Sequence, residues 1–318
     1  MQIITLGLNP AIDRIAACDA LAPGTHQSVK MLARIPAGKS ANVSRALALL
    51  GHDSLATGFM GRDEAEFFTR GLSGLSPGTV RSSWIMIDAG TRENLTILET
   101  TSGRETHLRE SGFRIDRQNL IDLYDKLVRL IDPGDMVVMA GSLPPDVSHD
   151  DLAEIINLLA SRAARVAVDT SGPALGITLK SPFWLAKPNL NELAEALGVP
   201  IDNDPHAILE AVRSAGLATE YILVSRGECG AMLIETRLGG HAWTSHAPSL
   251  WPVVRTVGCG DHLLAGFLSA GQRGMDAPTS LGFAVALATA RAVSRDYEYF
   301  DSARFSELSG RTKVELLC

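Results

Sequence analysis

Short apolar runs alternate along the chain with longer segments in which apolar residues recur every three or four positions. The short runs are typical of buried strands, and the longer spacing is typical of amphipathic helices. The predicted strands are Ile3–Leu8, Met136–Ala140, Val166–Val168 and Tyr221–Val224. The predicted helices are Asn42–Leu50, Leu120–Ile131, Leu152–Ala163, Glu192–Leu197 and Ala207–Ala215. This alternation predicts an α/β fold with a mostly parallel central sheet and helices on both of its faces.

The start of one helix is marked in detail. Ser148 precedes the predicted helix Leu152–Ala163, and Asp151 follows it three positions later. A serine followed at this distance by an acidic residue is typical of a capping box, in which each side chain bonds the other residue's backbone. We therefore expect Ser148 to cap this helix.

Two stretches lack the helical spacing. Asp13–Arg34 and Ser82–Leu108 contain short alternating segments such as Trp84–Asp88 and Leu95–Glu99. We interpret them as a small β-sheet that stands off the main domain and covers a cleft as a lid; surface hairpins without a role are the alternative. The predicted main domain comprises residues 1–12, 35–81 and 110–318, and the predicted lid comprises residues 13–34 and 82–109.

The composition excludes several classes of protein. The 318 residues are 46% hydrophobic and carry a formal net charge of −7, which disfavours disorder and non-specific binding to nucleic acid or anionic membranes. The cysteines form no C-x-x-C pair, which indicates reduced thiols in a cytoplasmic protein. The longest apolar stretch, Leu281–Ala290, is far shorter than the roughly 18 residues that a membrane span needs. We thus expect neither a nucleic-acid nor a membrane partner.

The densest chemical signal is Thr256–Asp261, which precedes an apolar helical face. Gly258 and Gly260 allow the backbone to approach a ligand, and the free N–H groups and dipole of a helix start attract an anion. Asp261 in the first turn is expected to stay ionised and to accept a proton from a hydroxyl, while the N–H groups neutralise charge on a transferring phosphoryl group. The alternative is that Asp261 only caps its helix.

Two common nucleotide-binding motifs do not fit. A dinucleotide fingerprint needs a third glycine where Leu263 stands, which disfavours a dinucleotide-dependent oxidoreductase. A Walker A loop needs a glycine five positions before Gly38, where the chain has Ala33. A P-loop NTPase is therefore disfavoured as well.

Eight motifs follow one another along nearly the whole chain. They are Leu8-Asn-Pro-Ala-Ile-Asp13, Ala37-Gly-Lys-Ser-Ala-Asn42, Thr91-Arg-Glu-Asn94, Gly141-Ser-Leu-Pro-Pro145, Asp169-Thr-Ser171, Lys187-Pro-Asn-Leu-Asn-Glu192, Ser225-Arg-Gly227 and Gly258-Cys-Gly-Asp261. In this order they resemble the motifs of ribokinase-like sugar kinases of the phosphofructokinase-B family. The nearest branch phosphorylates ketose phosphates. The resemblance implies the ribokinase-like fold, ATP as phosphoryl donor and Mg²⁺ as cofactor.

The resemblance places the catalytic centre in the last third of the chain. Asp261 corresponds to the family's catalytic base, and the turn Gly258–Gly260 corresponds to the anion hole that meets the γ-phosphate. Asn189 and Glu192 correspond to an N-x-x-E element that holds magnesium through water, which suits an ion that usually keeps several waters. The other residues implied at the nucleotide are Lys187, Ser225, Gly227 and Gly230, with Gly258 and Gly260 again.

The same resemblance implies a sugar-phosphate site. Its residues are Asp13, Gly38, Lys39, Asn42, Arg92 and Ser142. Asp13 is expected to accept hydrogen bonds from sugar hydroxyls. Lys39 and Arg92 offer a point charge and a planar fork to the substrate's phosphate, whereas the alternative makes them ordinary solvated charges.

The chain departs from the family pattern at two positions beside the predicted base. Cys259 stands where alanine or serine is usual, and a thiol at a helix N-terminus is expected to have a lowered pKa. His262 follows the base, and we expect it on the helix surface.

The favoured reaction is the ATP-dependent phosphorylation of D-fructose 1-phosphate to fructose 1,6-bisphosphate. Tagatose 6-phosphate and fructose 6-phosphate are alternative substrates within the family. A non-catalytic sugar-phosphate-binding regulator is the alternative of another class. Lid strands with unpaired edges also predict a homodimer formed through the lid.

Overall fold

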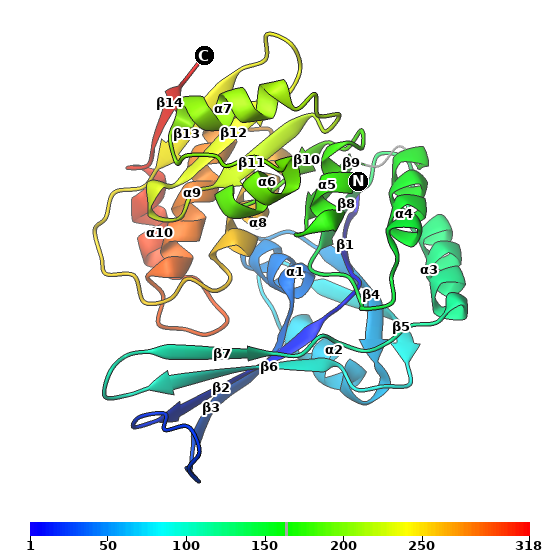
Figure 1. Cartoon of the computed structure of the whole chain (residues 1–318), viewed down its shortest axis with the longest axis vertical. Coiled ribbons are helices and arrows are strands. Elements are labelled where there is room, and N and C mark those ends of the chain that lie inside the picture. Colours follow the sequence, from blue (N-terminus) through cyan, green and yellow to red (C-terminus); the bar gives the residue numbers. More distant parts are fainter. Residues whose placement is uncertain (163–164) are drawn as a thin grey trace.

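The computed structural model describes residues 1–162 and 165–318, and in these residues a large and a small β-sheet are distinguished (Figure 1). In spatial order the large sheet consists of β14 (Lys313–Leu316), β13 (Ala242–His246), β12 (Ala231–Glu235), β11 (Tyr221–Ser225), β10 (Leu185–Ala186), β9 (Arg165–Asp169), β8 (Met136–Ala140), β1 (Ile3–Gly7), β4 (Ser54–Gly61) and β5 (Val80–Ile87). The strands from β11 to β5 are parallel, and β12, β13 and β14 add an antiparallel edge. The expected fold class is confirmed.

Helices cover both faces of the large sheet. One face carries α3 (Arg117–Leu130), α4 (His149–Ser161), α5 (Pro173–Leu179), α6 (Leu190–Leu197) and α7 (Pro205–Ser214). The other carries α1 (Lys39–Leu49), α8 (Cys259–Gln272) and α9 (Ala277–Ala292), with α2 (Ala65–Ser73) beside β5 and α10 (Ser302–Ser309) beside α9. Single 3₁₀ turns occupy Arg62–Glu64 and Gly227–Cys229. Within the described parts of the chain, every helix is too short or too polar to cross a membrane.

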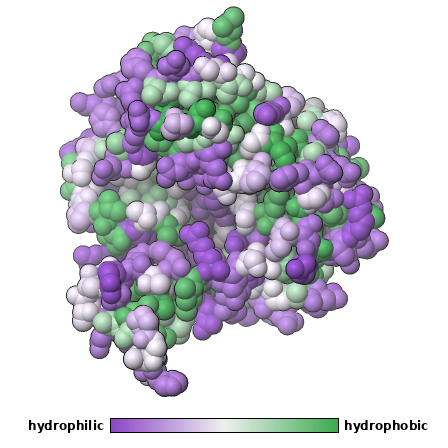
Figure 2. Space-filling view, viewed as in Figure 1, coloured by the Kyte–Doolittle hydropathy of each residue, from purple (hydrophilic) through white to green (hydrophobic). Residues whose placement is uncertain are grey.

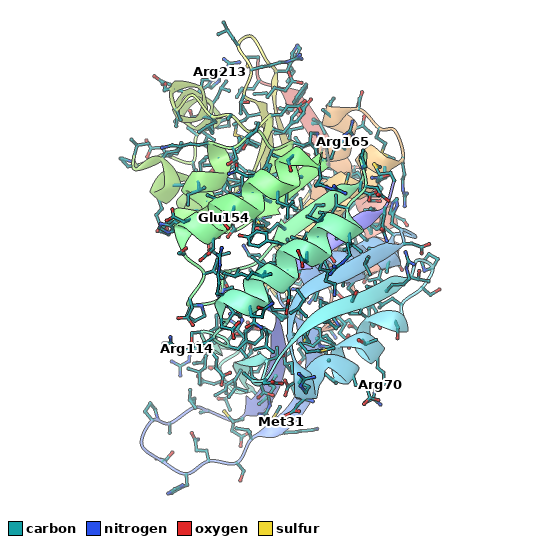
Figure 3. The ribbon with its side chains drawn as sticks, turned by 90° about the vertical axis from the view of Figure 1, so that its right-hand side faces the viewer. Met31, Arg70, Arg114, Glu154, Arg165 and Arg213 are labelled. Atoms are coloured by element: carbon teal, nitrogen blue, oxygen red, sulfur yellow. The ribbon has the colours of Figure 1, made fainter. Side chains whose placement is uncertain are left out.

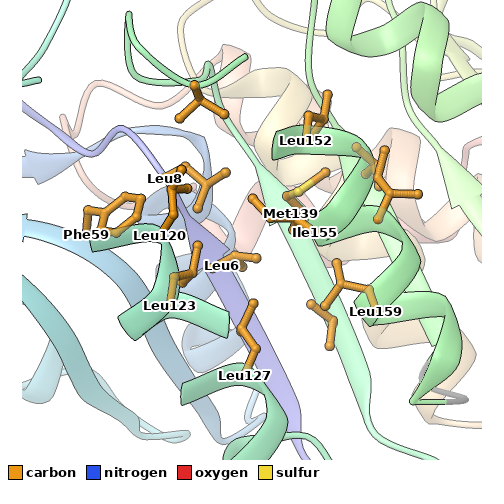
Figure 4. Packing of buried hydrophobic residues seen from close by; sticks show 14 of the residues in the cluster. Leu6, Leu8, Phe59, Leu120, Leu123, Leu127, Met139, Leu152, Ile155 and Leu159 are labelled. Atoms are coloured by element: carbon orange, nitrogen blue, oxygen red, sulfur yellow. The ribbon is translucent and has the colours of Figure 1, made fainter. Parts of the chain in front are cut away.

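The central strands bury both of their faces. Along β8, Met136 and Val138 pack with α1 and α8, whereas Val137 and Met139 pack with α3 and α4. Figure 4 shows the second of these clusters, where leucines of α3 and α4 close over β1 and β8. Strands buried on both faces are continuously apolar, which explains why short apolar runs locate them in the sequence.

The predicted helices agree with the observed ones to within a few residues at each end. The capping box of α4 is confirmed: Ser148 Oγ accepts a hydrogen bond from the Asp151 N–H (3.1 Å), and Asp151 Oδ2 accepts one from the Ser148 N–H (3.0 Å). Because the box fixes the start, α4 begins at His149, before the first apolar residue of the pattern. Ala163, the last residue of the predicted helix, lies outside the described residues.

A second sheet of four strands stands off the main body (Figure 1), and we call it the lid sheet. In spatial order it consists of β3 (Lys30–Ala37), β2 (Ala11–Cys18), β6 (Arg92–Glu99) and β7 (Glu105–Arg109). Met31 lies at its far end, opposite the end of the molecule that carries Arg213 (Figure 3). The expected small sheet is thus present.

The expected membership of the lid sheet is wrong for Trp84–Asp88. Trp84–Ile87 of this segment belong to β5, which pairs in parallel with β4 at the edge of the large sheet. An edge strand is only partly buried, as the strands of a free-standing sheet are. Trp84 of β5 packs against Phe68 of α2. β2 and β3 also extend into the predicted main domain, at residues 11–12 and 35–37. The remaining division into domains stays a prediction.

The carboxyl ends of the parallel strands meet at the edge of the sheet that faces the lid sheet. Chemistry-bearing residues end or follow β8, β9, β10 and β11 there: Ser142, Asp169, Lys187 and Ser225. The surface is hollowed between the lid sheet and the main body, and hydrophilic residues line this hollow (Figure 2). In open α/β sheets this edge is where ligands bind.

Candidate active site

The N-terminus of α8 provides the main-chain groups of the site. Gly258 is its N-cap residue and has φ 83°, a left-handed conformation that favours glycine. The first N–H groups of a helix have no partner inside it. In the described part of the chain, the N–H groups of Gly260 and Asp261 find no backbone carbonyl elsewhere either. Two adjacent donors are therefore free for an anion.

Asp261 reaches across to another helix. Its Oδ2 accepts a hydrogen bond from Asn42 Nδ2 of α1 (2.7 Å), and it makes no capping hydrogen bond to its own helix. The alternative that Asp261 only caps α8 is therefore wrong. Burial, followed by the negative charge of Asp169, raises the pKa of Asp261 to about 6. We expected the helix start to have the larger influence on this pKa, and it does not. The carboxylate is still largely ionised at pH 7, with a pKa suited to a general base.

Two lysines share one buried carboxylate beside Asp261. Asp169, at the end of β9, is fully buried; its Oδ1 lies 2.7 Å from Lys39 Nζ and its Oδ2 lies 3.0 Å from Lys187 Nζ. Burial alone would raise the pKa of Asp169, but the two lysines outweigh it and hold that pKa below its usual value. Asp169 stands in one of the recognised motifs, yet the sequence alone assigned it no role.

Lys187 borders the start of α8, and Lys39 borders the N-x-x-E element. Lys187 Nζ would be 3.3 Å from a Cβ atom on Gly260, so its ammonium group borders the free N–H groups of α8. Lys39 Nζ lies 3.9 Å from Glu192 Oε1 in addition to its contact with Asp169. Lys39 is thus ion-paired with carboxylates, and its side chain remains 33% exposed.

Arg291 of α9 adds a cation that the sequence did not single out. Its guanidinium donates to the backbone carbonyls of Asp296, Tyr297 and Tyr299, and its Nε has no partner among the described residues. A Cβ atom on Gly258 would lie 3.5 Å from this Nε. Burial, and then the charge of Arg255, lowers the pKa of Arg291 to about 10, so it remains positive beside the anion hole.

The N-x-x-E element also has a structural role. Asn189 Oδ1 accepts a hydrogen bond from the Glu192 N–H and Glu192 Oε2 accepts one from the Asn189 N–H, both at 2.8 Å, which caps α6. Glu192 Oε1 remains outside this box and faces Lys39. Among the described residues no three His, Cys, Asp or Glu side chains cluster as direct metal ligands. With this carboxylate oxygen outside the capping box, the residues fit a divalent ion that keeps several of its own waters.

The predicted nucleotide loop follows β11. Ser225 pairs with Asn189 in an isolated bridge, which places this loop beside the N-x-x-E element. Gly227 and Gly230 have φ values of 60° and 81°, and a Cβ on Gly230 would lie 2.0 Å from Ser245 O, so only glycine allows the turn into β12. Arg226 donates hydrogen bonds to the side-chain and backbone oxygens of Asn203.

The lid sheet brings a polar row over the site. Asp13 of β2, Asn94 of β6 and Arg109 of β7 are register partners in turn, and Asn94 Nδ2 donates to Asp13 Oδ1 (2.8 Å). Burial raises the pKa of Asp13, against the lowering effect of Asn94 and of Arg45, Arg92 and Arg109. Arg109 is exposed and was not predicted, because only the strand register shows that it joins this row.

The other predicted sugar residues surround the corner between β1 and β2. Arg92 donates to the backbone carbonyls of Asn9 (3.1 Å), Pro10 (3.2 Å) and Glu110 (3.3 Å). Ser142 Oγ accepts a hydrogen bond from Asn9 Nδ2 (3.2 Å). Gly38, the N-cap of α1, has φ 95° and would bring a Cβ to 3.3 Å from the backbone of Pro10 and Ala11. Arg92 and Ser142 thus both contact Asn9.

Two expectations beside the base are wrong. Burial raises the pKa of the Cys259 thiol to about 11, so a reactive thiolate is disfavoured. His262 is buried instead of exposed, and its Nδ1 donates to Gly258 O (2.8 Å). Burial and the charge of Arg291 lower the pKa of His262 to about 3, which keeps the ring neutral.

Comparisons with known proteins place this chain among carbohydrate kinases. A family model described as pfkB family carbohydrate kinase matches residues 2–296. A protein named 1-phosphofructokinase from Vibrio cholerae is 30% identical over 316 residues, which cover 99% of this chain and 97% of the other. One of the same name from Rhodobacter capsulatus is 34% identical over 284 residues, or 87% and 85% of the two chains. A tetrameric inhibited form of phosphofructokinase-2 from Escherichia coli shares the fold, with a TM-score of 0.87, 23% identity and coverage of 97% and 98%.

Proposed function

The chain belongs to the pfkB family of carbohydrate kinases, and on that premise we propose that it transfers the γ-phosphoryl group of ATP to D-fructose 1-phosphate, forming fructose 1,6-bisphosphate and ADP. The observation that carries the proposal is the position of Asp261. Its buried carboxylate lies at the free N–H groups of α8 and is hydrogen-bonded to Asn42 of α1. A base and an anion hole thus meet at one point.

The substrate class follows from the cations of the lid side. Arg92 and Arg109 flank Asp13, which supports a ligand that combines hydroxyl groups with a phosphate. Two curated relatives are named 1-phosphofructokinase, which favours fructose 1-phosphate within this class. Lys39, paired with Asp169, serves the transferred phosphoryl group in this assignment instead of the sugar's own phosphate.

The reaction requires one proton transfer and one displacement. Asp261 accepts the proton of the acceptor hydroxyl as its oxygen bonds to the γ-phosphorus, and the bond from that phosphorus to the bridging oxygen of ADP breaks. The N–H groups of Gly260 and Asp261, with Lys187 and Arg291 beside them, stabilise the negative charge of the transferring group. The base, the sugar and the phosphoryl group are all positioned before reaction, which is most of what phosphoryl transfer needs.

We assign the divalent metal site to Glu192 and Asn189. A Mg²⁺ ion held there through water would neutralise phosphate charge on the nucleotide. Glu192 Oε1 is the oxygen that remains for such a contact, and Lys39 orients it from the other side.

We also propose a cytoplasmic location and a homodimer that forms through the lid sheets. The scattered cysteines support the first assignment. Exposed apolar side chains on or beside the outer strands of the lid sheet support the second: Val29, Met31, Leu32 and Leu108. Among the residues that the structure describes, both outer strands also have an unpaired edge.

The test is the rate of ADP release with fructose 1-phosphate, fructose 6-phosphate, tagatose 6-phosphate and fructose, with Mg²⁺ and with chelator. We expect fructose 1-phosphate to be fastest, chelator to abolish turnover, and Asp261→Asn to lower kcat about 10²–10⁴-fold. Asp204→Asn is the matched control, since Asp204 only caps α7 and asparagine caps equally well.

Three results would contradict the proposal. Equal rates for Asp261→Asn and the unchanged protein would remove the base. Turnover of fructose alone would remove the argument for a phosphorylated substrate. ATP binding without ADP release on any sugar would instead indicate the regulator.

A further inference from the structure

Arg45 of α1 is a buried arginine beside the predicted base, and no step of the proposed reaction uses it. Its side chain is 3% exposed. One guanidinium nitrogen donates to Asn42 Oδ1 (3.0 Å), and the other donates to the backbone carbonyl of Pro36 (2.7 Å). Its Nε lies 3.6 Å from Glu298 Oε2. A buried charge is costly, so a side chain held in this way requires an explanation.

The contact with Asn42 decides which way that amide faces. An arginine only donates hydrogen bonds, so the Asn42 atom that it touches is the oxygen. The amide nitrogen then points to Asp261 Oδ2, at 2.7 Å. An ionised carboxylate only accepts hydrogen bonds, so a reversed amide would set two acceptors against each other. Arg45 therefore selects the single orientation of Asn42 that supports the base.

The remaining contacts hold Arg45 in place from two further elements. Pro36 O lies in the buried end of β3, the lid strand that leads into Gly38 and α1. Glu298 lies in the loop after α9, and Arg291 donates hydrogen bonds to backbone carbonyls of the same loop. Because its anchors belong to three separate segments, the guanidinium has little freedom to turn.

We infer that Arg45 is a positioning residue for catalysis: it fixes the Asn42 amide, which in turn orients Asp261 toward the acceptor hydroxyl. The inference rests on the proposed function in one respect, that Asp261 is the base. Arg45 itself touches neither the nucleotide nor the sugar in this assignment, and it acts through Asn42.

The charged groups that face Asp261 determine the expected effect on pH dependence. They are Asp169 after β9, Lys187 after β10, and Lys39 and Arg45 on α1, while Cys259 and His262 of its own helix stay neutral. The Asn42 hydrogen bond lowers the pKa of Asp261. Loss of the aligned amide and of the positive charge of Arg45 therefore shifts the ionisation of Asp261 to higher pH.

The test compares Arg45→Met with the unchanged enzyme. We expect kcat to fall about 10- to 100-fold, a small change in the KM for ATP, and an acid limb of the kcat profile displaced upward by about 0.5 pH unit or more. In Arg45→Met/Asn42→Ala, kcat should be close to that of Asn42→Ala alone, because both changes remove the same orientation. Arg45→Lys, which keeps the charge but offers one donor group instead of a fork, should recover the acid limb more than kcat.

Arg273→Met is the matched control. Arg273 donates to Leu50 O (2.7 Å) and so joins the other ends of α8 and α1, far from the base. It should lower the melting temperature and leave the acid limb unchanged. The inference is overturned if Arg45→Met, like Arg273→Met, leaves the acid limb unchanged. It is also overturned if the decreases in kcat caused by Arg45→Met and by Asn42→Ala multiply in the double variant.

Two further measurements keep the test decisive. If Arg45→Met does not fold, the pH dependence of kcat is measured for Arg45→Lys and Glu298→Gln instead. Unchanged kcat in both variants overturns the inference. If no sugar is turned over by the unchanged enzyme, the proposed function fails, yet the Asp261 carboxyl can still be titrated by ¹³C NMR, with its signal identified by its absence in Asp261→Asn. An equal pKa with and without Arg45 would then contradict the inference.

Discussion

At the scale of single residues, the site places an anion where the fold disfavours one. Asp261 is buried, and its neighbour Asp169 is negative. Such a carboxylate is held in place by the surrounding packing and by Asn42, since its own hydration is lost. A carboxylate that lowers the stability of the fold when it is ionised, and that must be ionised to act as a base, is typical of a functional site.

A prediction on stability follows from the raised pKa of Asp261. Its pKa is about 6 in the folded protein and about 3.8 when unfolded, so ionisation costs stability as pH rises through 6. Asp261→Asn removes this cost. We expect the variant to have the lowered kcat described above but to be more stable at pH 7, with the gain in stability shrinking as pH falls from 6 to 4. Thermal unfolding from pH 4 to pH 8 measures it, and a variant less stable at pH 7 would contradict the prediction.

The position of the proposed base could be identified from sequence, whereas the charged and polar groups around it could not. Asp261 stands in a glycine-framed motif at a helix start, which is a local signal. Arg45 lies three residues after Asn42, a spacing that puts both on one helix face, but its partners Pro36 and Glu298 are distant in sequence. The sharing of Asp169 by two lysines likewise depends on the sheet's strand order.

At the scale of elements, the geometry of the anion hole depends on the backbone of one residue. Gly258 begins α8 with φ 83°, a conformation that costs an L-amino acid about 1–2 kcal/mol. The N–H groups of the first turn are aimed by this residue. A side chain there acts on helix geometry and on ligand binding together.

Gly258→Ala is therefore expected to lower the free energy of unfolding by about 1–2 kcal/mol and to raise the KM for ATP. Gly271→Ala in the last turn of the same helix is the control, since Gly271 has an ordinary φ and a Cβ there would meet open space. The control should be neutral or stabilised by up to about 1 kcal/mol. Chemical denaturation and ATP titration measure both, and equal behaviour of the two variants would contradict the prediction.

Elements were easiest to predict where a strand is buried on both faces or a helix is capped by its own residues. β8 and the start of α4 meet these conditions. β5 does not, because as an edge strand it is only partly buried, as a lid strand is. The antiparallel edge from β12 to β14 was also missed, since its pairing is set by the neighbouring strands and not by local pattern.

At the scale of the whole molecule, the lid sheet is a thin layer with apolar residues exposed on its outer strands. Leu108 on β7 is 54% exposed and Met31 on β3 is 43% exposed. A four-stranded sheet with such residues gains stability if it is covered by another surface. The proposed dimer supplies that surface from a second lid.

Leu108→Asp is expected to convert the dimer to a monomer, because a buried carboxylate at an apolar interface opposes association. Val128→Asp on α3, where Val128 is also exposed (43%), is the control and should leave the dimer intact. Sedimentation of the three proteins at micromolar concentration measures the change. A monomeric unchanged protein, or dissociation caused by Val128→Asp alone, would contradict the proposed interface.

The corner between β1 and β2 has a consequence for how the two sheets move. Arg92 donates to the carbonyls of Asn9 and Pro10, the residues at which the chain leaves the large sheet for the small one. If an anionic group draws this guanidinium toward itself, Arg92 loses its hydrogen bonds to these carbonyls, and the corner becomes free to bend. Occupancy by substrate and the angle between the sheets are then parts of a single equilibrium, so a sugar lacking its phosphate would leave the angle unchanged.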